Sequence, residues 1–273
     1  MKKIIIPLLS VLLLFGCNVD SEKLERVRIS GDVVSRNYQL EAFDELVVAG
    51  PIHVILDQNR GSSAEVTSYE SMMDLFNAKV IDGTLYLYVV DTTEGESFHI
   101  ESEFDEISSN ALLSGSRIKW PKNEKLLDVH LSLKDLESIQ VIGECEITNE
   151  TRFRGDRLEL DVAGALRMET QMEVEEFDVE IAGAANLELK GSCDRFVLEC
   201  AGAGNIKAYE FIAAEVSIDV AGACNAQVFA IEELNVNMAG LGSVKYKGNP
   251  ARTNFDKAGI GRIRKAESDD VEL

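Results

Sequence analysis

Hydrophobic and polar residues alternate through the second half of the chain around a recurring Ala-Gly dipeptide. The positions one and three residues before the alanine are mostly apolar, as are those four and six residues after the glycine. The intervening positions are mostly polar, which is the period of two expected for strands with one buried side. Each repeat therefore predicts two short strands separated by a bend at the small Ala-Gly pair. The dipeptide occurs at Ala163-Gly164, Ala182-Gly183, Ala201-Gly202, Ala221-Gly222, Ala239-Gly240 and Ala258-Gly259.

The spacing of this dipeptide predicts the fold. Successive alanines are 19, 19, 20, 18 and 19 residues apart, and Ile142-Gly143 adds an earlier member. A unit this short cannot bury its apolar side alone, whereas stacked units merge their apolar columns into one core. We therefore expect an all-β fold, a single-stranded parallel, right-handed β-helix or solenoid of ~19-residue coils. A β-propeller would need blades of ~40–50 residues, and a sandwich would not give this periodicity.

The first half of the chain is less regular but also reads as β-structure. Residues 46–56 echo the repeat around Ala49-Gly50. At the other end, Lys257 and Lys265 occupy apolar columns of the last coil, which suits a terminal cap that resists edge pairing. Further short strands are expected at 64–68, 79–90 and 97–103, a short helical turn at 70–76, and transitional coils over 111–149.

The N-terminus has the pattern of an export signal. Lys2 and Lys3 precede an apolar run from Ile4 to Phe15, which is well short of the ~20 residues that span a bilayer as a helix. The run ends in Gly16-Cys17 and resembles the bacterial lipobox, although Phe15 departs from the usual small residue. The resemblance implies lipidation of Cys17; an ordinary signal peptide cut nearby is the alternative.

These features divide the chain into segments. We expect a lipoprotein anchored in the cell envelope at the outer membrane, with the periplasmic or surface side left open. Asp20 and Glu22, soon after the cysteine, resemble surface-export signals. The segments are a signal with lipobox at 1–17, a polar tether at 18–40, a solenoid domain at 41–264 (irregular over 41–143, regular over 144–264) and an acidic tail at 265–273.

The net charge of the chain limits the classes of partner that it can bind. The formal net charge is -21, and removal of Lys2 and Lys3 with the signal makes it -23. Such a polyanion is repelled by phosphate backbones and anionic membrane surfaces, so nucleic acid is excluded as a partner. Four cysteines besides Cys17 lack zinc-site spacing and are interpreted as small buried residues of the repeats. They are Cys145, Cys193, Cys200 and Cys224, and whether any of them pair is open.

The chain resembles a known family, the auto-transporter adhesin head GIN domain of Bacteroidetes lipoproteins. The resemblance rests on residues 43–58, on Asp82-Gly83 with the strand after it, and on rungs such as 201–205 (Ala-Gly-Ala-Gly-Asn). It implies a β-helical domain on an exported lipoprotein. It supplies no catalytic motif, so no residue inherits a role from it.

Two polar columns accompany the repeat. The column two residues before each Ala-Gly alanine should point outward, and its stacked carboxylates would repel one another unless cations, water or basic neighbours intervene. A weak Ca²⁺ ladder is one interpretation, and a solvated strand face is the favoured one. The acidic column is Asp161, Glu180, Glu199, Asp219, Asn237 and Asp256. The second column, three residues after each glycine, is interpreted as a structural hydrogen-bonded stack: Arg167, Asn186, Asn205, Asn225, Ser243 and Arg262.

The residues favour a binding protein over an enzyme. None of His53, His99 and His130 has a nucleophile in a recognisable local context, and no phosphate-cradling loop is present. The leading hypothesis is a binding or adhesion-type module whose partner is a glycan or an envelope or host protein, with an open oligomeric state. The alternatives are a structural envelope lipoprotein acting through a protein partner, and a polysaccharide-active β-helix enzyme.

Overall fold

A computed structural model describes residues 30–59, 61–89 and 127–266. The export signal, Cys17, most of the tether, the strand expected at 97–103, His99 and the tail from 267 lie outside the described residues. Within the described ranges, no helix is long and apolar enough to cross a membrane.

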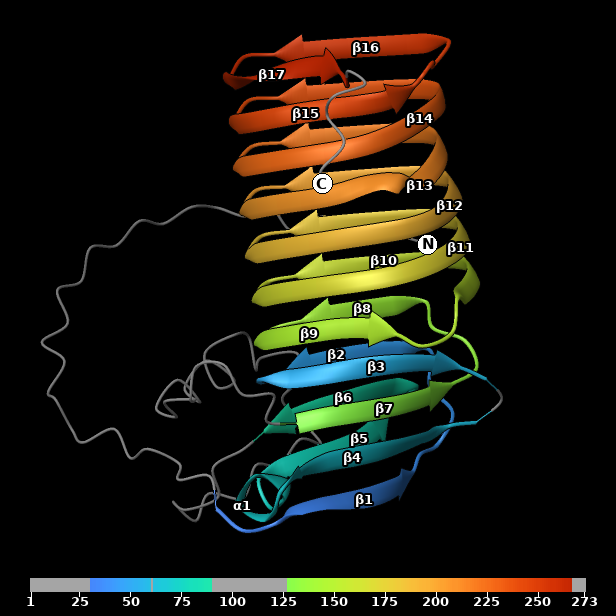
Figure 1. Ribbon diagram of the computed structural model, residues 1–273, viewed down its shortest axis with the longest axis vertical. Coiled ribbons are helices and arrows are strands. Elements are labelled where there is room, and N and C mark those ends of the chain that lie inside the picture. Colours follow the sequence, from blue (N-terminus) through green and yellow to red (C-terminus); the bar gives the residue numbers. More distant parts are fainter. Residues whose placement is uncertain (1–29, 60, 90–126, 267–273) are drawn as a thin grey trace, which may run out of the picture.

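The strands stack coil upon coil along the long axis of the molecule and pair into one continuous 17-stranded sheet (Figure 1). Each coil crosses two walls of this sheet, which we call the first sheet and the second sheet. The segment before an Ala-Gly bend belongs to the first sheet, and the segment after it belongs to the second. All pairings are parallel except β1–β4, β4–β7 and β5–β6. This arrangement confirms the expected β-solenoid with a less regular N-terminal part.

The order of strands in the two sheets follows from their pairing. The first sheet contains β5 (Phe76–Ile81), β6 (Thr84–Val89), β2 (Glu45–Ala49), β8 (Ser138–Val141), β10 (Phe153–Val162), the C-terminal parts of β11 (Ala165–Ile181), β12 (Ala184–Cys200), β13 (Ala203–Val220) and β14 (Ala223–Met238), and β16 (Arg252–Lys257). The second sheet contains β1 (Val33–Gln39), β4 (Ser63–Tyr69), β7 (Leu127–Leu133), β3 (Ile52–Gln58), β9 (Glu144–Asn149), the N-terminal parts of β11 to β14, β15 (Leu241–Gly248) and β17 (Ile260–Lys265). A single helical turn, α1 (Glu70–Met73), joins β4 to β5.

The Ala-Gly bends lie directly above one another, and their backbone spacing explains the dipeptide. The N–H groups of Ala201 and Gly202 both donate to the carbonyl oxygen of Ile181 at 2.9 Å. An added Cβ at Gly202 would lie only 2.0 Å from the carbonyl oxygen of Gly183 in the coil below. Because the bends approach this closely, a side chain cannot be accommodated at the glycine.

The N-terminal coils contain the same bend but are not stacked in chain order. Strands β2 and β3, which flank Ala49-Gly50, lie between the β6/β7 coil and the β8/β9 coil. A Cβ at Gly143 would lie 2.4 Å from the backbone nitrogen of Gly50. Both bends that the sequence indicated, at 49–50 and 142–143, therefore belong to one continuous column.

The core runs along the axis between the sheets and is built from the alternating apolar columns. Phe177 and Phe196 stack with their ring centroids 5.7 Å apart, and Phe211 packs edge-on against Phe196 at 5.8 Å.

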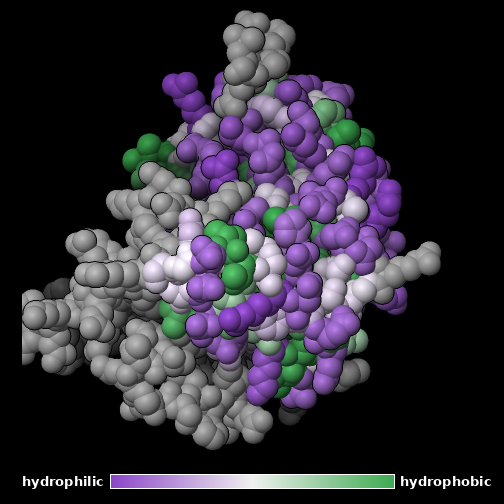
Figure 2. All heavy atoms as spheres, turned by 60° about the horizontal axis from the view of Figure 1, so that its bottom comes forward, coloured by the Kyte–Doolittle hydropathy of each residue, from purple (hydrophilic) through white to green (hydrophobic). Residues whose placement is uncertain are grey.

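The last coil differs from the regular ones, since Phe255 in the inward column is 42% exposed. Lys257 reaches across this end and donates to the carbonyl oxygen of Gly261 at 3.0 Å. Toward the opposite end, Figure 2 shows a mostly hydrophilic surface with hydrophobic residues in small, separate groups.

Candidate functional site

The acidic column predicted from the sequence lies in register on the outward side of the first sheet. Asp161 is the strand partner of Glu180, and Glu180 of Glu199. Glu199 pairs with Asp219, and the column continues through Asn237 to Asp256. With its neighbours on the same side of the first sheet, it forms the acidic face. The acidic face consists of the outward residues Arg157, Glu159, Asp161, Glu176, Asp178, Glu180, Arg195, Val197, Glu199, Glu215, Ser217, Asp219, Glu233, Asn235, Asn237, Arg252, Asn254 and Asp256.

Arginines neutralise part of this acidic face. Arg157 and Arg195 both bind the carboxylate of Asp178, at 2.8 and 3.2 Å, from the coils on either side of it. Arg252 binds Glu233 at 2.6 Å in the same way. These are exposed pairs between neighbouring coils, and water screens such pairs, so each contributes little to stability. These arginines occupy the row farthest from the Ala-Gly bend, and the carboxylates that they bind, Asp178 and Glu233, belong to the neighbouring rows and not to the acidic column.

Asp161 of the acidic column is half-buried and lies beside other carboxylates. Burial raises the pKa of this carboxyl group, and the negative charges of Glu180 and Glu159 raise it further. Even so, the ranges that the structure describes contain no group of three or more His, Cys, Asp or Glu side chains placed to hold a metal ion. The acidic column brings its candidate calcium ligands into a line and does not gather them around one point.

The predicted asparagine column also lies in register, on the outward side of the second sheet. Arg167, Asn186, Asn205, Asn225, Ser243 and Arg262 are successive strand partners. The amide of Asn205 donates to the Oδ1 atom of Asn186 at 3.4 Å, so the stack includes a hydrogen bond of the expected kind. These side chains form a straight row of hydrogen-bonding groups along the axis.

A second row on this sheet was not predicted, and its charge changes sign along the axis. It lies five residues after each glycine, and its members are Glu169, Glu188, Lys207, Gln227, Lys245 and Arg264. Acidic side chains occupy the earlier coils, and basic or neutral ones occupy the coils from β13 onward. The same column could have been read from the sequence by continuing the alternation one step beyond the asparagines.

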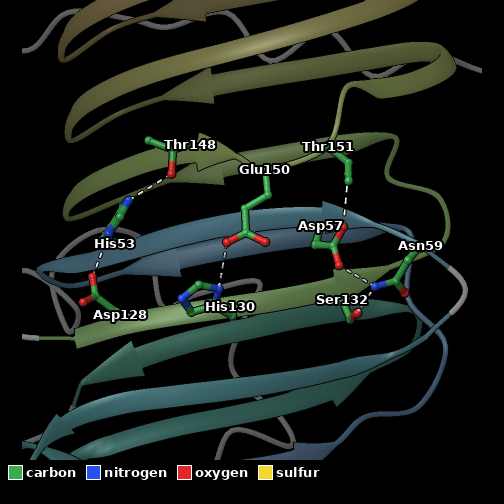
Figure 3. A network of polar contacts seen from close by, with 9 residues as sticks. All are labelled: His53, Asp57, Asn59, Asp128, His130, Ser132, Thr148, Glu150 and Thr151. Atoms are coloured by element: carbon green, nitrogen blue, oxygen red, sulfur yellow. Dashed lines mark hydrogen bonds and ion pairs between the residues drawn. The ribbon is translucent and has the colours of Figure 1, made fainter.

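A hydroxyl, an imidazole and a carboxylate meet lower on the second sheet, where three distant segments adjoin (Figure 3). His53 on β3 has one ring nitrogen, Nδ1, 2.7 Å from Asp128 on β7 and the other, Nε2, 3.0 Å from Thr148 on β9. The His53 residue is buried, with 8% of its surface exposed. The sequence did not indicate this set because its members lie 75 and 95 residues apart.

Hydrolases use this order of groups, but here the surroundings favour a structural role. Thr148 lies within β9, whose backbone pairs with β3 on one side and β11 on the other. The backbone N–H groups of β9 therefore form hydrogen bonds with the neighbouring strands. In a hydrolase, by contrast, hydrogen-bond donors near the nucleophile point at the oxygen atom on which negative charge develops. With a ring proton on Nδ1, His53 donates to Asp128 and accepts from Thr148, which satisfies both ring nitrogens. The three residues tie together coils that come from separate parts of the chain.

Further polar contacts extend this tie along the same strands (Figure 3). The amide of Asn59 donates to Asp57 at 2.5 Å and to Ser132 at 2.6 Å. Thr151 donates to the other carboxylate oxygen of Asp57 at 3.1 Å. Nearby, His130 lies 3.5 Å from Glu150, both exposed. Strand β3 is therefore linked through side chains to the coils on both of its sides.

The four cysteines of the solenoid are buried free thiols. Burial raises the pKa of Cys145 above its ordinary value and that of Cys193 to about 12, so both thiols stay protonated. Cys200 and Cys224 lie together near the bend, where a Cβ added at Gly204 would lie 3.1 and 3.4 Å from their sulfur atoms. Their mutual hydrogen bond raises the pKa of Cys224 and lowers that of Cys200.

Comparison with known proteins identifies the family. A family model described as "Putative auto-transporter adhesin, head GIN domain" matches residues 42–250, and the chain belongs to this family. No curated protein matches the sequence. The expected resemblance is thereby confirmed.

Solved structures with the same fold come from Bacteroides and Parabacteroides species. A putative adhesin from Bacteroides fragilis is 20% identical, with 87% of this chain and 99% of that one covered and a TM-score of 0.69. A putative lipid binding protein from Parabacteroides distasonis is 18% identical, with 89% and 100% covered and a TM-score of 0.60. A putative adhesin from Parabacteroides merdae is 16% identical, with 87% and 97% covered and a TM-score of 0.61. At these identities the likeness concerns the fold.

Proposed function

We propose that this protein is a lipid-anchored binding module of the cell envelope, of the adhesin type, that holds its partner on the flat outward sides of the solenoid. The observation that carries the proposal is the in-register repetition of polar side chains. Asn186, Asn205 and Asn225 occupy equivalent outward positions in three successive coils. Family membership and the solenoid fold support it.

The rigidity of these outward sides favours binding. Each outward row stands on strands whose other side packs into a continuous apolar core, so its geometry is fixed before a partner arrives. A preorganised surface loses less conformational entropy on association than a flexible one. A row that repeats with every coil, at about 4.8 Å, suits a partner with repeating groups of its own, such as a glycan chain.

A glycan array tests the proposed function. The full chain with Cys17→Ser, which removes the expected lipid, is labelled and applied to neutral and charged glycans. Binding that saturates and is lost on thermal unfolding supports the proposal. Silence on the array, together with co-purification of one envelope protein from the parent cells, would instead establish the structural lipoprotein alternative.

The membrane anchor is tested separately. The proposal places a lipid on Cys17, supported by the Gly16-Cys17 motif after a short apolar run. Cells grown with radiolabelled fatty acid should incorporate label into the wild-type protein and not into Cys17→Ser. The variant should also move from the membrane fraction to the soluble fraction, because the run alone is too short to anchor it. Equal membrane retention of both forms would refute lipidation as the anchor.

A further inference from the structure

Two cysteines from successive coils meet in the core beside the Ala-Gly bends. Cys200 is the last residue of β12, directly before one bend, and Cys224 is the second residue of β14, directly after the next bend. Both residues are buried, with 2% and 1% of their surface exposed. The chain makes one complete coil of the solenoid between these two thiols, so a bond between them would join neighbouring coils.

A glycine in the same inward column lets the two sulfur atoms come together. Gly204 is the strand partner of Cys224, and the same column carries the side chains of Leu166 and Ala185 in the two preceding coils. A Cβ at Gly204 would lie 3.1 Å from the sulfur atom of Cys200 and 3.4 Å from that of Cys224. Because this coil has no side chain at that position, both sulfur atoms reach within 3.4 Å of one point.

The two thiols are also hydrogen-bonded to each other. The S–H group of Cys224 donates to the sulfur atom of Cys200, which lowers the pKa of Cys200 and raises that of Cys224. The S–H group of Cys200 donates in turn to the carbonyl oxygen of Gly202 at 3.8 Å. Thiols are weak hydrogen-bonding groups, so the chemical importance of the contact lies in the proximity of two sulfur atoms.

The other two cysteines occupy different places in the stack. Cys145 lies in the column of Gly204 but three coils before it, where its strand partner is Leu166. Cys193 lies on β12 beside Val174, away from the bends. Burial raises the pKa of both thiols, so both stay protonated and are poor nucleophiles. They therefore serve as controls within the same chain.

We propose that Cys200 and Cys224 form a disulfide bond in the exported protein and thereby fasten two successive coils at their bends. Exported bacterial proteins enter an oxidising compartment, where disulfides form and persist. The inference goes beyond the proposed function and depends only on its statement that the protein is exported. The bond restricts the unfolded chain, so it stabilises the stack without altering the outward rows.

The bond forms by exchange with an external disulfide, that of a protein thiol oxidoreductase or of oxidised glutathione. The thiolate of Cys200, whose pKa is lowered, attacks one sulfur atom of the oxidant and releases the other as a thiol. Cys224 then loses its proton and attacks the Cys200 sulfur atom of the mixed disulfide, which releases the second thiol. The two cysteines thus lose two electrons and two protons, and the oxidant gains them. Because both thiols are buried in the folded chain, the exchange takes place while the coils assemble.

Peptide mapping tests the bond directly. The wild-type chain is isolated from acid-quenched parent cells, its free thiols are blocked with N-ethylmaleimide, and tryptic peptides are analysed without reduction. Cleavage after Arg195, Lys207 and Lys245 places Cys200 and Cys224 in different peptides. We expect peptides 196–207 and 208–245 to be joined and lighter by two hydrogen atoms than their sum. Cys145 and Cys193 should carry N-ethylmaleimide.

Thermal melting with and without a reducing agent tests what the bond does. The full chain with Cys17→Ser is refolded in a glutathione redox buffer, which should form the same bond. Reduction after unfolding, followed by refolding in reductant, should lower the melting temperature by about 5–10 °C. Reductant added to the folded protein should act slowly, because the buried disulfide is shielded from it.

Two variants remove the bond with residues that the repeat already uses. Cys200→Val introduces the residue of its strand partner Val220, and Cys224→Ala introduces the residue found at Ala185. The melting temperature of either variant should not depend on reductant. Cys193→Ala is the matched control, and it should keep the full dependence. An equal response of Cys193→Ala and Cys200→Val to reductant would contradict the proposal.

The place of failure identifies which premise is wrong. Free thiols at Cys200 and Cys224 after refolding in the glutathione buffer would overturn the disulfide on geometric grounds and leave the proposed function standing. A bond that forms in this buffer but is missing from quenched cells would overturn the disulfide in the cell and contradict export. A bond from either residue to Cys145 or Cys193 would overturn the assigned pairing.

Discussion

The C-terminal and N-terminal parts of the solenoid share one cross-section but are assembled differently. Strands β10 to β17 are stacked in chain order, so each coil packs on the coil that precedes it in the sequence. Below them, β2 and β3 lie between coils formed by later segments. A β-solenoid therefore does not require neighbouring coils to be neighbours in sequence. It requires matching strand edges and a bend that allows close approach.

The largest expected effect concerns the core of the regular coils. Phe196→Ala should lower the free energy of unfolding by about 3–5 kcal/mol, because it leaves a cavity between Phe177 and Phe211. Since coils contact only their neighbours, hydrogen exchange should accelerate more in β11 to β13 than in β3 and β7. Urea denaturation and amide exchange measure these quantities.

Leu131→Ala in the interleaved part is the matched comparison. Leu131 is fully buried on β7, so its truncation should cost about 2–5 kcal/mol. The exchange pattern should be reversed, with the greater acceleration in β3, β4 and β7. A uniform acceleration in both variants would show that the two parts unfold as a single unit.

The bend column gives the next largest effect. Gly202→Ala places a Cβ 2.0 Å from the Gly183 carbonyl oxygen, so the stacked backbones must move apart. We expect a loss of about 2–3 kcal/mol, at the upper range for overpacking. The control is Gly155→Ala, whose Cβ would meet the Phe153 ring at an ordinary 3.5 Å. Thermal melting of both variants decides the matter, and equal melting temperatures would contradict the steric explanation.

Loss of the side-chain contacts that join the interleaved coils around His53 should have an intermediate effect on the free energy of unfolding. Asp128→Asn removes the charged partner of the buried His53 and should destabilise the fold by about 1–3 kcal/mol. Glu150→Gln, which changes the exposed contact with His130, should stay within about 0.5 kcal/mol of wild type. Chemical denaturation at neutral pH measures both. A stability for Asp128→Asn equal to that of the control would remove the structural role assigned to this cluster.

The smallest expected effect is a pH dependence that separates two carboxylates of the regular coils. The raised pKa of Asp161 means that the folded protein binds its proton more tightly than the unfolded chain does. Its contribution to stability therefore falls as pH rises from the ordinary aspartate pKa of 3.8 through the raised pKa. Asp161→Asn should stabilise the protein at neutral pH by less than about 1 kcal/mol, and the gain should vanish in acid.

Glu173 should show the opposite sign. Its pKa is lowered by the hydrogen bond from Arg154 and by a second contact with Arg152. Its contribution is present above the ordinary glutamate pKa of 4.5 and is lost as pH falls through the lowered value. Glu173→Gln should therefore destabilise the protein slightly at neutral pH and not in strong acid. Melting temperatures measured across the range from strong acid to neutral pH should separate the two variants, and parallel curves would contradict the assignment.

The sequence predicted most where the cause was local. The alternation around Ala163-Gly164 and its successors follows from one buried side per strand, and the structure shows these columns in register. The short turn expected at 70–76 is α1, which ends already at Met73. The strand expected at 79–90 is divided at Asp82-Gly83 between β5 and β6, and β5 begins three residues earlier than expected. The acidic and asparagine columns were found because each is a single position of a repeat.

What the sequence missed depends on contacts between distant segments. The cluster at His53 combines residues from three strands, and no local pattern connects them. The row that contains Lys207, Lys245 and Arg264 was also missed, because the negative net charge of the whole chain drew attention to the carboxylates. Its members could have been found from the period, because the row containing Lys207 is the next outward position after the asparagines.

The sequence by itself determined the coil: its length, its buried columns and the glycine at its bend. These depend on strand alternation and on steric limits that act within one repeat and its neighbour. The tertiary structure decided which coils are adjacent in the N-terminal half, because several strand edges offer equivalent backbone groups and only packing and ties such as His53–Asp128 select among them. It also decided how charge is distributed, since the sum of charges in a chain carries no information about the sheet on which each one lies.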